Sequence, residues 1–189
     1  MNQPFPTLVR SAEVDALCSL LRAELSSRET YRTAAAAIRR GPESHSLSLR
    51  HLYHGHGRLA FELRKLIREV GGLPAGAGRV RGVWSGVRAR VAAARKGREG
   101  VRAMLRALRQ GELYSLALTA GALGDLRGTS AAWVRGRLME GIVTNLGLLA
   151  ALEVSACDAL SDRDPVLRPG RQRGEDRSRE SRRVQPVPR

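Results

Sequence analysis

The histidines of this chain are the first residues whose type and spacing could do chemistry, because clustered histidines are common transition-metal ligands. All four lie in one short stretch: His45, His51, His54 and His56. On a continuous helix, at 100° per residue, they point in different directions. We expect His56, which is in line with Leu52 and Leu59, to face the interior and the other three to lie on the surface. The alternative is that Gly55 and Gly57 kink this turn and gather the histidines, since each glycine costs a helix about 1 kcal/mol relative to alanine.

Glu112 is a carboxylate at the centre of an apolar helical stripe, and a carboxylate there needs a partner. The stripe consists of Val101, Leu105, Leu108, Leu116 and Leu123. The favoured interpretation is a buried structural charge paired with His56 or with an arginine. The alternative is a metal site built from Glu112, His56 and Glu29, which would hold iron or another transition metal. The first helix has its own apolar stripe, made of Val14, Leu17, Cys18, Leu21, Leu25 and Ala35. Arg28 and Arg32 are expected near the middle of this first stripe, where two cations would oppose metal loading.

Basic residues dominate the charge of the chain. The formal net charge is +15, and Lys65 and Lys96 are the only lysines. Residues 79–109 carry ten of the basic residues against the single acid Glu99. The predicted polyanion-binding residues in this patch are Arg79, Arg81, Arg88, Arg90, Arg95 and Lys96. They would bind nucleic acid or another acidic surface through phosphates, with little sequence selectivity. The other interpretation is an ordinary solvated surface in which arginine has replaced lysine.

Helical spacing of apolar residues predicts the elements that position these groups. The expected helices are 12–40, 46–70, a short basic crossover 79–96, 100–123 and 130–160. Gly41-Pro42 ends the first helix, and the run from Gly71 to Pro74 ends the second. On the crossover helix, we expect Trp84 to dock against the other helices. Residues 1–11 are expected to be a flexible N-terminus, 12–160 one domain, and 161–189 a disordered tail rich in arginine and proline.

Two helix pairs joined by a longer crossover are the layout of ferritin-like four-helix bundles. Four short motifs make the likeness more specific: 27–35 (SRETYRTAA), 59–63 (LAFEL) running on to 70–74 (VGGLP), Val83-Trp84, and 111–113 (GEL). With these motifs the chain resembles a bacterial ferritin-like four-helix-bundle family of unknown function, over roughly residues 12–153. The resemblance implies an all-α, ferritin-like four-helix bundle with the basic crossover helix between its second and third long helices.

The metal ligands of ferritin-like enzymes are largely missing from this sequence. Such enzymes place a Glu-x-x-His motif on each of two helices, because a spacing of three residues aims both side chains inward. The chain contains no such motif. Glu140 is expected on the outer face of the last helix, and Glu24 and Glu29 at the two edges of the first stripe. The metal ligands of the family are therefore degraded, and Glu112 is the one centred carboxylate.

The sequence therefore predicts a protein that is not an enzyme and has no cofactor. It would act as a binding or assembly protein through a basic surface, and homo-oligomerisation is possible. The two alternatives are a residual metal-binding protein and a non-specific polyanion or nucleic-acid binding protein. Two widely separated cysteines, Cys18 and Cys157, indicate no disulfide framework. No stretch of about 18 uninterrupted apolar residues predicts a transmembrane segment, so we expect a cytoplasmic protein.

Overall fold

The regular secondary structure of the described residues is all helical, which confirms the predicted all-α class. The structure is a computed structural model that describes residues 12–38, 43–74, 83–93 and 97–161. No strand occurs in these ranges. The predictions of a flexible N-terminus and a disordered tail concern residues outside them, apart from Ser161, which ends the last helix.

The predicted helices are present, with shifts of a few residues at their ends. They are α1 (Ala12–Ala37), α2 (Glu43–Glu69), α3 (Val83–Ala93), α4 (Gly97–Ala122), α5 (Gly128–Trp133) and α6 (Glu140–Ser161). A 3-10 turn, η1 (Leu123–Asp125), follows α4, and a π-helical segment, η2 (Val134–Met139), joins α5 to α6. The single last helix predicted from the sequence corresponds to the continuous rod α5–η2–α6, which contains a π-helical segment that the sequence did not indicate. α3 is shorter than the predicted crossover helix, whose remaining residues are not described.

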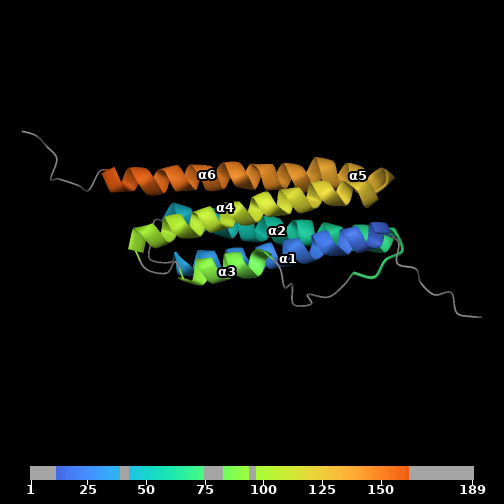
Figure 1. The fold of residues 1–189 in the computed structure, drawn as a ribbon, viewed down its shortest axis with the longest axis horizontal. Coiled ribbons are helices and arrows are strands. Elements are labelled where there is room, and N and C mark those ends of the chain that lie inside the picture. The colour runs from blue at the N-terminus through green and yellow to red at the C-terminus, as the bar shows by residue number, and fades with distance from the viewer. Residues whose placement is uncertain (1–11, 39–42, 75–82, 94–96, 162–189) are drawn as a thin grey trace, which may run out of the picture.

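Four long rods lie lengthwise beside one another: α1, α2, α4 and the continuous run from α5 to α6 (Figure 1). α1 and α2 run in opposite directions and pack together, and so do α4 and α6. α2 and α4 run in the same direction, so the chain must return along the length of the molecule between them. α3 lies on this return path and packs against both α1 and α4. The chain therefore crosses over between its two helix pairs rather than making a tight turn.

Trp84 fixes α3 against the rest of the protein. Its side chain is 2% exposed, and its indole Nε1 donates a hydrogen bond to Ser115 Oγ of α4 at 3.2 Å. Gly111 of α4 provides the space for the ring, because a Cβ atom there would come within 2.6 Å of Trp84 Cη2. Val87 and Val91 of α3 are buried in the same core. The prediction that the crossover helix docks through Trp84 is confirmed.

One helix in the described ranges has the length and apolar composition to cross a membrane, namely the rod Gly128–Ala156. Only 22% of its most apolar window is buried, and Val143 and Val154 are exposed on it. Thr144 and Asn145 interrupt its apolar run, which is why the sequence criterion of uninterrupted apolar residues excluded it. A core helix of a soluble protein meets the same test when it is mostly buried, whereas this window is largely exposed in the described structure.

Candidate functional site

A fully buried histidine lies between two glutamates in the interior, where three of the long helices meet. His56 comes from α2, Glu24 from α1 and Glu112 from α4. The exposed fractions of the three residues are 0%, 1% and 0%. Each of the three residues lies among the buried apolar residues of its helix, so its side chain points into the interior. The prediction that His56 and Glu112 both face the interior is confirmed.

Both ring nitrogens of His56 make hydrogen bonds to carboxylates. Nδ1 lies 2.7 Å from Glu24 Oε2, and Nε2 lies 3.0 Å from Glu112 Oε1. Burial by itself lowers the pKa of His56, but the two carboxylate charges and their hydrogen bonds raise that pKa to about 10. The ring is therefore an imidazolium at neutral pH, and each of its N–H groups donates to one glutamate.

Tyr31 of α1 completes this centre. Its hydroxyl donates to Glu112 Oε1 at 2.7 Å, and its ring stacks on the His56 ring with centroids 5.0 Å apart. Burial, together with the charge of Glu112 and the hydrogen bond to it, raises the pKa of Tyr31 well above its ordinary value. The tyrosine therefore stays protonated and remains a donor. We call Glu24, Tyr31, His56 and Glu112 the buried centre.

Asn145 of α6 and one oxygen of Glu112 lie at the open side of the hydrogen-bond network. The Asn145 side-chain amide is 3.4 Å from His56 Nε2. Glu112 Oε2 is buried and has no hydrogen-bond partner. Leaving a buried carboxylate oxygen without a hydrogen bond costs free energy. Among the fully buried side-chain atoms of the buried centre, Glu112 Oε2 is the one that has no hydrogen-bond partner.

In the structure, the buried centre is closed by hydrogen bonds between its own side chains. Histidine binds a metal through an unprotonated ring nitrogen, at about 2.0–2.1 Å for zinc. Here both His56 nitrogens lie within hydrogen-bond distance of carboxylate oxygens, so a metal would have to replace at least one of these two contacts. Within the described ranges, no group of three or more His, Cys, Asp or Glu side chains has the geometry of a metal site.

The predicted metal ligand Glu29 is not part of the buried centre, and Glu24 takes its place. Glu29 is 44% exposed and pairs with Arg32, whose Nη2 atom lies 2.6 Å from Glu29 Oε1. Arg32 itself is 62% exposed, so the expectation that it lies mid-stripe was wrong. α1 packs against α2 on one side and against α3 and α4 on another, and this wide buried face lies rotated from the predicted stripe. The rotation moves Glu24 from its edge into the interior.

His45 corrects a second expectation, because it is 2% exposed rather than a surface residue. α2 begins at Glu43, three residues earlier than predicted, and the extra turn adds His45 to the buried positions Leu49, Leu52 and His56. His51 and His54 are exposed, as expected. α2 runs unbroken through Gly55 and Gly57, so the alternative of a kink that gathers the histidines is wrong.

The predicted basic patch on the crossover lies mostly outside the described residues. Arg79, Arg81, Arg95 and Lys96 are not described. Arg90 is exposed on α3, and Arg88 is partly buried with no hydrogen-bond partner at its buried Nε. On the last rod, Glu140 is exposed on the outer face, as predicted.

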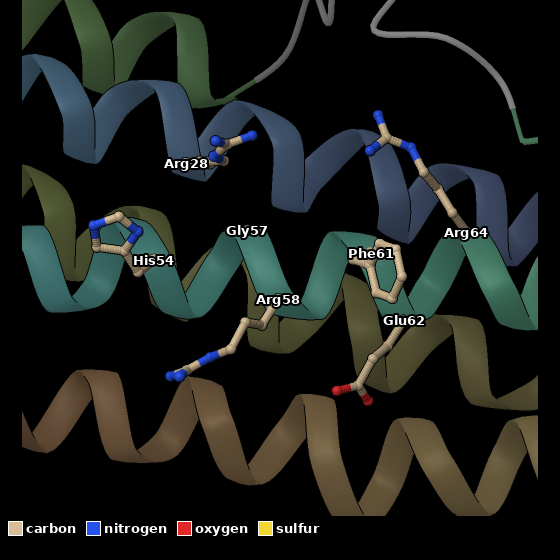
Figure 2. A pocket seen from close by; sticks show the side chains of 7 residues that line it. All are labelled: Arg28, His54, Gly57, Arg58, Phe61, Glu62 and Arg64. Atoms are coloured by element: carbon tan, nitrogen blue, oxygen red, sulfur yellow. The ribbon is translucent and has the colours of Figure 1, made fainter.

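A second arrangement, which the sequence did not predict, is a surface pocket on α2 of about 460 Å³. Its lining residues are Arg28, His54, Gly57, Arg58, Phe61, Glu62 and Arg64 (Figure 2). Arg28 reaches it from α1 and is fixed on Tyr53 by a 2.8 Å hydrogen bond from Nη2 to the hydroxyl and by stacking over the ring. We call it the Gly57 pocket.

Comparison of the chain with family models, curated proteins and solved structures found no match.

Proposed function

We propose that this chain is a ferritin-like four-helix-bundle protein that performs no catalysis and acts as a binding or assembly protein through a basic surface. The buried centre supports the absence of metal chemistry, because an imidazolium stands between its two carboxylates. It also supports a structural role for these charges. Removing one partner of a buried ion pair is strongly destabilising, and here the pairs connect α1, α2 and α4.

The directions of the long rods support the ferritin-like assignment. The first pair is antiparallel, a lengthwise crossover follows, and the second pair is again antiparallel (Figure 1). This is the order of a bundle with one long crossover. The described ends also separate Cys18, early in α1, from Cys157, late in α6, because these helix ends lie at opposite ends of the molecule.

The observation that carries the binding proposal is the charge of the exposed face of α2. Its exposed cations are Arg50, Arg58, Lys65 and Arg68, and the exposed histidines 51 and 54 lie among them. The exposed acid described on this helix is Glu69, whose Oε1 lies 3.7 Å from Lys65 Nζ. Four exposed cations against this one exposed acid leave the face with a net positive charge. Such a face attracts polyanions.

Fluorescence anisotropy with a labelled 20-base-pair DNA duplex tests this proposal in the full chain. We expect affinity to fall steeply between 50 and 200 mM salt, since each phosphate contact releases counterions. The variant Arg50→Ala/Arg68→Ala should bind more weakly and with a shallower salt dependence. The matched variant Arg135→Ala/Arg137→Ala removes two charges from η2 and should change binding less. Absent or salt-insensitive binding, or equal effects of both variants, would exclude this face as the binding surface.

Residual metal binding is the second candidate, and the unpartnered Glu112 Oε2 atom is the observation that favours it. A metal would have to displace the proton from His56 Nε2 and separate that nitrogen from Glu112 Oε1. We rank this function below the first because both changes break hydrogen bonds that the structure already contains.

A further inference from the structure

The Gly57 pocket is an open depression on the surface of α2. Gly57 lies at its centre, with His54 on one side along α2 and Phe61 on the other, and its missing side chain leaves room for the Arg28 side chain from α1 (Figure 2). A Cβ atom on Gly57 would lie 3.3 Å from Arg28 Nε, so even an alanine would crowd the wall formed by α1. The volume of about 460 Å³ lies within the range of ordinary ligand pockets.

The charge lining the Gly57 pocket is positive. Arg28, Arg58 and Arg64 each bring a guanidinium group, and none of them makes an ion pair with an acid in the described part of the chain. Arg28 Nε is also buried without a hydrogen-bond partner, although Nη2 is engaged by Tyr53. Guanidinium groups match the oxygen spacing of phosphates and carboxylates. The pocket therefore offers donors to an anion.

The single acid of the lining is held by another residue. Glu62 Oε2 accepts a 3.0 Å hydrogen bond from the indole nitrogen of Trp133. In Figure 2 the Glu62 side chain extends toward the α5–α6 rod, away from Arg28 and Arg64 on the α1 side. Its charge is therefore displaced from the part of the pocket where these two guanidinium groups lie.

An exposed aromatic ring gives the Gly57 pocket a second recognition element. Phe61 is 68% exposed, and its ring stands over α2 between Arg58 and Arg64 (Figure 2). Exposed aromatic rings beside arginines provide stacking surfaces for nucleobases, and such stacking adds to phosphate contacts.

We propose that the Gly57 pocket binds a nucleoside phosphate, with the phosphate on Arg28 and Arg64, the base on Phe61, and Arg58 closing the opposite side. This inference goes beyond the proposed function, because a small-molecule site on α2 does not require that the surface bind a polymer. It also concerns residues other than the Arg50 and Arg68 pair used to test polyanion binding.

Isothermal titration calorimetry of the full chain at 150 mM salt, with AMP as the probe, tests this site. We expect saturable binding of one AMP per chain. The variant Arg58→Ala/Arg64→Ala should weaken it at least tenfold, while Arg50→Ala/Arg68→Ala, which removes the same charge from the same helix outside the pocket, should leave it within twofold. Circular dichroism of each variant checks that the helices are retained.

Inorganic phosphate, adenosine and a third variant separate the two parts of the site. Phe61→Ala should weaken AMP binding several-fold and leave phosphate binding unchanged. Adenosine alone should bind more weakly than AMP. No saturable AMP binding, or an equal loss in both arginine variants, would overturn the site. Phosphate binding as tight as AMP would overturn the assignment of Phe61 to the base. Loss of DNA binding in Arg50→Ala/Arg68→Ala with AMP binding intact would support both proposals separately.

Discussion

The ion pairs around His56 predict that the protein loses stability as the pH rises above neutrality. Below pH 6.5 the histidine carries its proton in both the folded and the unfolded chain, so the full stabilisation is present. Between pH 6.5 and about 10 the unfolded chain releases a proton that the folded chain keeps on His56. Folding is then coupled to proton uptake, so the free energy of unfolding must fall across this range.

The size of the loss follows from the difference between the two pKa values of His56. The pKa rises from 6.5 to about 10, and each unit corresponds to about 1.4 kcal/mol. The stability should fall by about 1.4 kcal/mol per pH unit, and by about 5 kcal/mol in all. Protein domains have total stabilities of about 5–15 kcal/mol, so a loss of about 5 kcal/mol is large enough to measure by urea unfolding. Above pH 10 the raised pKa of Tyr31 adds a further loss, because only the unfolded chain ionises its hydroxyl.

Urea unfolding followed by circular dichroism at pH 6, 7, 8 and 9 measures this slope. The variant His56→Gln should abolish the slope, and His54→Gln, a change at an exposed position on the same helix, should keep it. If His56→Gln proves too unstable, NMR of the wild type should still find an imidazolium ring at His56 at pH 8. A free energy of unfolding that stays constant from pH 6.5 to 9 would refute the charged buried centre.

Two further predictions concern packing around the buried centre. Gly111→Ala should destabilise the protein by about 1–3 kcal/mol, because the added Cβ would meet the Trp84 ring at 2.6 Å. Gly121→Ala on the same helix has nothing within 4 Å of its Cβ and should be neutral or stabilising. Equal melting temperatures of the two variants would contradict the docking of Trp84. Tyr31→Phe should lower the free energy of unfolding by about 1–3 kcal/mol, because it removes the hydroxyl that donates to Glu112 Oε1. Urea unfolding measures this loss, and an unchanged midpoint would mean that the hydrogen bond adds no net stability.

Helix positions and two residues of the buried centre could be predicted from the sequence because the signal was local. Apolar residues at helical spacing revealed each long rod, and His56 and Glu112 each stood at the middle of such a stripe. A polar residue in that position has to face the interior when the stripe packs. The topology could be predicted because a helical segment of the crossover's length returns the chain along the molecule. Because this topology places Cys18 and Cys157 near opposite ends of the molecule, mild oxidation of the folded chain should form no disulfide between them.

Glu24 and Tyr31 were missed because α1 is buried over more than one face. Leu17, Glu24, Tyr31 and Ile38 follow one another at intervals of seven residues, and all four are buried. This spacing places them on one line of the helix, and it was the available signal. The predicted stripe instead followed the most apolar residues, which pack on neighbouring faces. Which of these faces meets α4 depends on tertiary packing.

The Gly57 pocket depends on contacts between helices and so was not visible in the sequence. Gly57 entered the sequence analysis only through the alternative of a kink, whereas the structure shows an unbroken helix in which the missing side chain makes room for Arg28 of α1. The approach of residues 28 and 57 is set by how the two helices pack. Phe61 lies 180° from Leu52 at 100° per residue, so the sequence pattern already indicates its 68% exposure, but not its place beside an arginine of α1.

Elemental analysis of the protein, purified under mild conditions without chelators, tests most directly whether the buried centre is closed by its own charges. Because the His56 imidazolium occupies the position between Glu24 and Glu112, we expect less than about one tenth of an equivalent of iron, manganese or zinc per chain. The Glu112→Gln variant should show the same low content and should bind DNA as the wild type does. A stoichiometric transition metal that disappears in folded Glu112→Gln protein would contradict the structural interpretation of the buried centre and establish a metal site in its place.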